Sequence, residues 1–177
     1  IMLERMINDN SVQAGIYAQA YRFFEASNMF AYLFAALLLP IFSRMLKNNE
    51  SVYELVTFSF KLLMSFGLML SVFCFFYSYE IMDIRYAENI IESSVVFKIL
   101  MICFLCVSST YIYGTLLTAN GNLFYLNLVA AFGVILNVVL NLILIPQYNA
   151  IGSAMASLIT QFLTGFLQII LCVYIFR

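Results

Sequence analysis

Five stretches of this sequence are long enough and apolar enough to cross a lipid bilayer as helices. A crossing helix needs about 20 mostly apolar residues, because each residue advances the helix by about 1.5 Å through a hydrocarbon layer of about 30 Å. The stretches lie at about residues 12–42, 55–79, 95–119, 123–145 and 151–176. None shows the ten-residue alternation that is typical of a membrane β-barrel strand. The sequence therefore predicts an all-α, polytopic membrane helix bundle.

The composition excludes most other classes of protein. Of the 177 residues, 64% are apolar and 10% are charged, whereas soluble domains average about 45–50% and about 25%. Too few polar residues are present to cover a soluble surface, and a disordered chain would carry far more charge. A net charge of −1 gives no electrostatic footprint for nucleic acid, so we expect no nucleic-acid partner.

Residues 1–177 are predicted to form a single transmembrane domain that is a fragment of a longer protein. The chain opens at Ile1, and residues 1–8 have the character of the end of a sixth helix. Pro40 is expected to bend or end the first helix. The connectors, where Asn, Gly, Pro and charged residues gather, are expected at residues 8–11, 47–51, 80–94, 120–122 and 146–149.

Charged residues near the helix ends predict the orientation of the bundle. Lys and Arg accumulate in the cytoplasmic loops of membrane proteins. Arg44, Lys47 and the terminal Arg177 fall on one side if the five helices alternate in direction, and the acidic segment 80–94 falls on the other. The sequence therefore predicts a multi-pass protein of the cytoplasmic (inner) membrane, with loop 44–54 and the C-terminus in the cytoplasm.

The first stretch carries a polar and aromatic stripe. At about 100° per residue, an arc of about 80° holds Tyr17, Tyr21, Glu25, Asn28 and Tyr32. Arg22 flanks the stripe, although a charge at the centre of a membrane helix costs about 2.5–3.5 kcal/mol on insertion scales. Two interpretations stay open. Arg22 and Glu25, three residues apart, form a neutralised pair that ties helices together, or the stripe lines a water-filled cavity.

Other polar side chains inside the stretches are further candidates for a cavity. Lys61 lies about two turns from the cytoplasmic end of the second stretch, where it can also extend to the lipid headgroups. Asn127, Asn137 and Asn141 share a face of the fourth stretch. One face of the fifth stretch holds Ser153, Ser157, Gln161, Thr164 and Gln168. Amides in such positions also hydrogen-bond neighbouring helices, for about 0.6–2 kcal/mol each, so cavity and packing roles both stay open.

The sequence contains no pattern for catalysis, metal binding or a cofactor. His is absent, which removes the usual general base and the usual metal ligand. The four cysteines lie within apolar stretches, where Cys packs as a small apolar side chain. The Cys103–Cys106 spacing has no second pair, and no Gly-rich phosphate-binding loop is present. We therefore expect no enzyme activity, no cofactor and no metal.

Four motifs, in this order, give the chain a family resemblance. They are residues 15–22 (GIYAQAYR), 39–44 (LPIFSR), 137–146 (NVVLNLILIP) and 151–157 (IGSAMAS). Together they resemble the C-terminal half of the polysaccharide-transporter branch of the multidrug/oligosaccharidyl-lipid/polysaccharide flippase superfamily. The chain departs from the family pattern at Asn149, where a Gly is usual.

The resemblance implies half of a transporter. Members of this family have two six-helix bundles that rock around a central cavity, and they flip lipid-linked oligosaccharides across the cytoplasmic membrane for surface polysaccharide biosynthesis. The chain would be most of the second bundle. Its partners would be the missing N-terminal six-helix half, the lipid-linked oligosaccharide (a polyprenyl-diphosphate repeat unit) and membrane lipids.

The resemblance also implies roles for particular residues. Arg22 stands at the basic position of the family's first motif, so it would hold the diphosphate with Glu25 and Lys61, while Tyr and Asn side chains contact the sugars. Two other functions stay open: a cation-coupled multidrug exporter of the same superfamily, with Glu25 as its cation or proton site, and a membrane scaffold that transports nothing. The candidate cavity residues are Arg22, Glu25, Tyr21, Tyr17, Asn28, Lys61, Asn137, Asn141 and Gln161.

Overall fold

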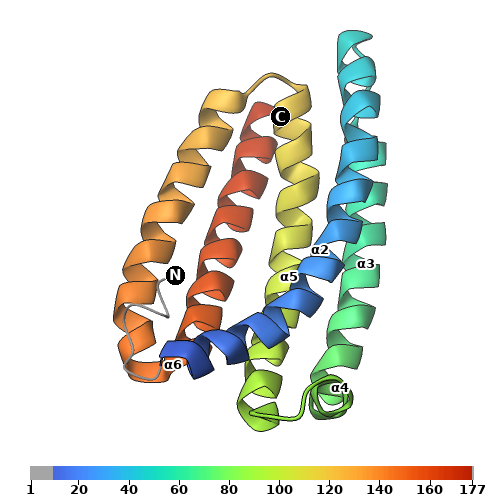
Figure 1. Cartoon of the computed structure of the whole chain (residues 1–177). Helices are drawn as coiled ribbons and strands as arrows, with labels where there is room; N and C mark the ends of the chain where they lie inside the picture. Colours follow the sequence, from blue (N-terminus) through green and yellow to red (C-terminus); the bar gives the residue numbers. More distant parts are fainter. Residues whose placement is uncertain (1–9, 177) are drawn as a thin grey trace.

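The computed structural model describes residues 10–176, and these form helices joined by short connectors. Four of the helices are long and apolar enough to cross a membrane, which confirms the predicted class of helical membrane bundle. The expected end of a sixth helix at residues 1–8 lies outside the described residues. In chain order the helices are α2 (Asn10–Lys47), α3 (Tyr53–Phe76), α4 (Ser78–Arg85), α5 (Ile90–Ala119) and α6 (Leu123–Ile175) (Figure 1).

Helix α5 is the centre of the bundle. It packs against α2, α3, α4 and α6. Half of the residues in its most apolar segment are buried, compared with 22–28% in the corresponding segments of the other long helices. Phe97, Leu100, Met101 and Phe104 are at most 1% exposed. Because lipid is as apolar as these side chains, close van der Waals packing rather than removal from water holds the other helices to α5.

Small residues bring α2 and α3 close to α5. On α2 the buried face includes Ala20 and Ala31, which are fully buried. On α3 the buried face carries Ser59, Gly67 and Ser71 at four-residue multiples, and the Ser71 hydroxyl donates a hydrogen bond of 2.6 Å to the Met101 carbonyl of α5. Small side chains at this spacing let helix backbones approach each other in a membrane.

Helix α6 is bent into two limbs, residues 123–148 and 150–175, which lie side by side in opposite directions (Figure 1). The bend is at Asn149, whose φ of 52° and ψ of −130° are not helical. The two limbs correspond to the fourth and fifth predicted stretches. The predicted connector at residues 146–149 is wrong in extent, because helical structure continues through Pro146.

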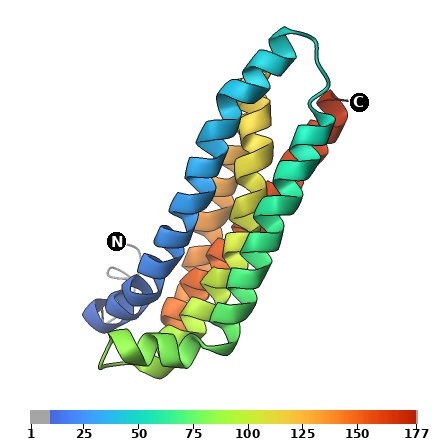
Figure 2. The ribbon, with the colours of Figure 1, turned by 90° about the vertical axis from the view of Figure 1, so that its right-hand side faces the viewer.

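Two other expectations about the helix ends need correction. Pro40 was expected to bend or end the first helix, and it does not end it, since α2 continues to Lys47 with this exposed proline inside it. The predicted connector at 80–94 contains most of α4 and the first turn of α5. Helix α4 lies across the end of the bundle rather than along it (Figure 2).

The connectors gather at the two ends of the bundle. One end carries the turn after Lys47, the turn at residues 120–122 and residue 176, and the other carries α4 and the bend at Asn149 (Figures 1 and 2). Exposed Arg44 and Lys47 lie at the first end. Exposed Glu80 and Asp83 of α4 lie at the second. The basic and acidic residues that the sequence predicted on opposite sides thus lie at opposite ends of the bundle.

Candidate functional site

A polar cleft of about 550 Å³ lies between α2, α5 and the two limbs of α6. Hydroxyl and amide side chains from all three helices line it, although the surrounding bundle is strongly apolar. Its polar lining, which defines the polar cleft, consists of Tyr17, Tyr21, Thr110, Asn137, Ser157, Thr160, Gln161, Thr164 and Gln168.

Gln13 of α2 joins this helix to α5 and α6 at the end of the bundle that carries the bend at Asn149. Its side-chain oxygen accepts a hydrogen bond of 3.2 Å from the backbone N–H of Ala150, in the first turn of the second α6 limb. Its side-chain nitrogen donates one of 3.2 Å to Glu92 of α5. From this end α2 slants away from α6 (Figure 1).

Asn137 is held in place by its neighbours. Its side-chain nitrogen donates a long hydrogen bond of 3.4 Å to the Thr160 hydroxyl on the opposite limb. The Asn141 side-chain nitrogen donates to the Asn137 carbonyl at 2.8 Å and to its side-chain oxygen at 2.9 Å. Asn141 is only 5% exposed and does not line the cleft. Asn141 therefore orients a cleft residue instead of facing a ligand itself.

Two side-chain carbonyl oxygens at this site accept no hydrogen bond within the described residues. They belong to Gln168, which lines the polar cleft, and to Asn141. A buried polar atom left unpaired costs about 1–3 kcal/mol. Both oxygens are buried, so a ligand cannot reach them in this conformation, and the Gln168 oxygen lies near Gly114 of α5.

A second cavity, also of about 550 Å³, lies along α2 beside the polar cleft, and we call it the charged groove. It is lined by Arg22, Glu25, Asn28 and Tyr32 of α2 and by Tyr111 of α5. The Tyr32 and Tyr111 rings are 6.3 Å apart.

Arg22 and Glu25 are both exposed in the charged groove. They form no ion pair with each other in the part of the chain that the structure describes. The neutralised pair that the sequence allowed is therefore not formed here.

A row of aromatic rings on α2 lines the polar cleft. The Tyr17 and Tyr21 rings are 5.7 Å apart and nearly parallel, and the Phe24 ring lies 5.7 Å from that of Tyr21. Thr110 lines the polar cleft and Tyr111, the next residue of α5, lines the charged groove. The two cavities therefore adjoin on both helices.

Most of the residues that the sequence singled out lie in these two cavities. Tyr17, Tyr21, Asn137 and Gln161 line the polar cleft, and Arg22, Glu25 and Asn28 line the charged groove. Lys61 lies exposed on α3 and lines neither of them.

Sequence reasoning missed five of the polar residues that line the polar cleft, Thr160 among them. The candidate residues omitted Ser157, Thr164 and Gln168, although their spacing on one face of the fifth stretch was a usable signal. Thr110 gave no signal, because a lone Thr in an apolar helix usually bonds to its own backbone, as it does here to the Val107 carbonyl at 2.7 Å.

Comparisons of this chain with protein-family models, with curated proteins and with solved structures find no match. Within the described residues, no group of three or more His, Cys, Asp or Glu side chains is placed to hold a metal ion. What the two cavities offer is one guanidinium, one carboxylate and a set of hydroxyl and amide groups. These groups can bind a hydroxyl-rich ligand through hydrogen bonds, and the charges of Arg22 and Glu25 balance each other.

Proposed function

We propose that the chain is part of a membrane flippase that moves lipid-linked oligosaccharides across the cytoplasmic membrane by alternating access. The observation that carries the proposal is the polar cleft and the adjoining charged groove in an otherwise apolar bundle. Charged and amide groups are costly in hydrocarbon and usually face a water-filled path or a partner. A lipid headgroup made of diphosphate and sugars needs such a path, while its tail can stay in the bilayer.

The two cavities suggest a division of roles. Arg22 is exposed in the charged groove, and a guanidinium binds phosphate oxygens through charge-assisted hydrogen bonds. The side chains of Asn137 and Gln161 line the polar cleft, where amides can bond sugar hydroxyls. Tyr17 and Tyr21 offer flat rings in the polar cleft, where a sugar ring can stack.

The proposal includes a topology. Helices α2, α3 and α5 and the two limbs of α6 would each cross the membrane, because each limb spans 26 residues and needs about 20. Arg44 and Lys47 would place that end of the bundle, and the C-terminus with it, in the cytoplasm. The end of a sixth helix at residues 1–8 and an N-terminal six-helix half would complete the transporter and close the cavities from the other side.

A cation-coupled exporter is the second candidate. The observation that favours it is Glu25, which is exposed in the charged groove and has no ion-pair partner within the described residues. An unpaired carboxylate in a membrane cavity is a common site for a proton or a sodium ion. Glu25→Gln would then abolish transport together with its dependence on an ion gradient, whereas a flippase that uses Arg22 would retain part of its activity.

The experiment compares two basic residues of the membrane helices in the full-length protein. We expect Arg22→Ala to reduce surface polysaccharide about tenfold or more, equivalent to about 1.4 kcal/mol of lost binding, with accumulation of the lipid-linked intermediate. Arg22→Lys should keep part of the activity, because the charge remains. Lys61→Ala is the matched control, since Lys61 lines neither cavity. Normal export by Arg22→Ala at normal expression would remove Arg22 from the mechanism.

A further inference from the structure

A third depression runs along the bundle between α3 and the second limb of α6, and α5 forms its floor. It consists of two cavities of about 500 Å³ and about 190 Å³. We call it the tail groove. Its floor residues recur at helical spacing along one face of α5: Leu105, Cys106, Ser109, Tyr113 and Leu116.

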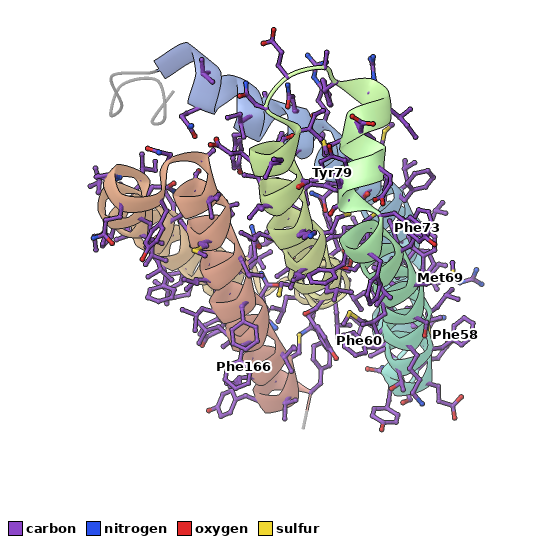
Figure 3. The ribbon with its side chains drawn as sticks, turned by 90° about the horizontal axis from the view of Figure 1, so that it is seen from below. Phe58, Phe60, Met69, Phe73, Tyr79 and Phe166 are labelled. Carbon is purple, nitrogen blue, oxygen red and sulfur yellow. The ribbon has the colours of Figure 1, made fainter. Side chains whose placement is uncertain are left out.

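The two cavities of the tail groove meet at an aromatic contact. Phe60 of α3 lines the smaller cavity and Tyr113 of α5 lines the larger one, and their ring centroids are 5.5 Å apart. Figure 3 shows Phe60 on the side of α3 that faces α6, where Phe166 lies, and Phe58 on the opposite side. The two cavities thus follow each other along the same pair of helices, which both pack on α5, with the Phe60 and Tyr113 rings at their boundary.

The tail groove is longer than one leaflet of a bilayer is thick. Its α6 wall runs from Gln161 to Phe176, and 15 residues of helix span about 22 Å. Half of the hydrocarbon layer is about 15 Å thick. The groove therefore extends from the surface of the bundle inward by at least the depth that one lipid tail occupies.

The two ends of the tail groove differ in polarity. The end at the turn after Lys47 is lined by Glu50 and Ser51, and the Glu50 carboxylate accepts a hydrogen bond of 3.0 Å from the Asn48 side chain. The inner end is lined by Met64, Phe162 and Ile169. This carboxylate attracts the amine of a zwitterionic headgroup, and exposed Arg44 and Lys47 at the same end of the bundle can attract its phosphate.

The dimensions favour a single hydrocarbon chain over a helix of a partner protein. A helix with its side chains is about 10–12 Å wide, and the inner cavity of about 190 Å³ is too small for one. A flexible alkyl chain fits a narrow strip with aromatic walls, and the four long apolar helices place the bundle among such chains.

We propose that the tail groove binds one phospholipid, with an acyl chain between α3 and α6 and an amine-bearing headgroup beside Glu50. The site is separate from the polar cleft and the charged groove, because α5 and the second limb of α6 lie between them and only Gln161 borders both sides. The bound lipid would fill the space between α3 and α6, so it would act as a structural part of the bundle.

The test counts phospholipids that stay bound to the full-length protein after detergent purification and incubation with phosphatidylethanolamine, by native mass spectrometry. Val173→Trp places a large ring in the tail groove, and Tyr174→Trp places the same ring on an exposed position outside it. We expect wild type and Tyr174→Trp to retain one lipid, and Val173→Trp to retain at least about tenfold less, or about 1.4 kcal/mol in affinity. Equal retention by all three proteins would overturn the proposal.

Further variants show whether a loss of bound lipid comes from misfolding, and they test which headgroup the site prefers. Thr57→Trp on the α3 wall, with Phe58→Trp as its control, should repeat the result in a protein whose helical circular dichroism is unchanged. With phosphatidylglycerol in place of phosphatidylethanolamine, wild type should bind several-fold less, and Glu50→Gln should lose this preference. A preference that survives in Glu50→Gln would overturn the role of Glu50. Polysaccharide export reports on the flippase proposal separately.

Discussion

The side-chain oxygen of Gln13 accepts a hydrogen bond of 3.2 Å from the backbone N–H of Ala150. This bond joins α2 to the point where α6 reverses direction, and it satisfies one of the N–H groups that a helix leaves unpaired in its first turn. Because α2 slants away from α6 beyond this point (Figure 1), Gln13 fixes α2 to α6 at this end of the bundle.

Removal of this bond should weaken the contact between α2 and α6. We expect Gln13→Ala to lower the free energy of unfolding by about 1–2 kcal/mol, since the Ala150 amide loses its acceptor. Chemical denaturation of the purified protein in detergent measures the change. Gln147→Ala is the control, because Gln147 is exposed on the other side of the bend. Equal stability of the two variants would show that the bond contributes nothing.

The bend of α6 should tolerate no side chain at Gly152. A β-carbon there would overlap the backbone carbonyl of Leu144 on the other limb, and backbone cannot move aside as a side chain can. We expect Gly152→Ala to cost about 1–3 kcal/mol of unfolding free energy. Gly15→Ala meets open space and should be neutral or slightly stabilising, because Ala favours helix. A neutral Gly152→Ala variant would contradict the observed approach of the two limbs.

Asn149 should be a strained residue that glycine relieves. Its φ of 52° with ψ of −130° is a conformation that glycine adopts easily and other residues adopt at a cost of about 1–3 kcal/mol. We expect Asn149→Gly to raise the thermal midpoint of unfolding and Asn149→Ala to lower it. If Asn149→Gly is less stable than wild type, an interaction of the Asn side chain outweighs the strain.

Asn141 should affect transport through Asn137. Asn141→Leu keeps the approximate volume but removes both hydrogen bonds to Asn137, so the Asn137 amide can turn away from the polar cleft. We expect weaker export of polysaccharide at near-normal protein levels, with Asn127→Leu as the control, since Asn127 is exposed and lines neither cavity. Full export by Asn141→Leu would show that the orientation of Asn137 is unimportant.

Helix length and polarity were readable from the sequence, because the bilayer imposes a minimum length on each apolar stretch. Helix α4 was missed, because an eight-residue helix with Glu80, Asp83 and Arg85 leaves no long apolar signal. The polar and aromatic stripe on α2 could be predicted from its helical period, but the identity of α6 as the helix across the polar cleft could not. The contact of Gln13 with Ala150 joins residues 137 positions apart, and no local pattern encodes such a pairing. Lys61 was grouped with the cavity residues because the sequence does not show which face of α3 lies next to the cavities.

The central claim is that the polar cleft is wet, and thiol labelling in the intact membrane tests it most directly. The four native cysteines are first replaced by alanine, since Cys103 itself lines the cleft. Single cysteines are then introduced by Tyr21→Cys, Asn137→Cys and Val139→Cys. Val139 lies two residues from Asn137 on an exposed face outside the cavities, so it reports on the same depth facing lipid.

Only the thiolate reacts with a water-soluble maleimide, and a thiolate forms only where water reaches the sulfur. We predict that cysteines at positions 21 and 137 react at least about tenfold faster than the cysteine at position 139, a difference of about 1.4 kcal/mol in activation free energy. Equal rates at all three positions, or faster reaction at position 139, would contradict the account.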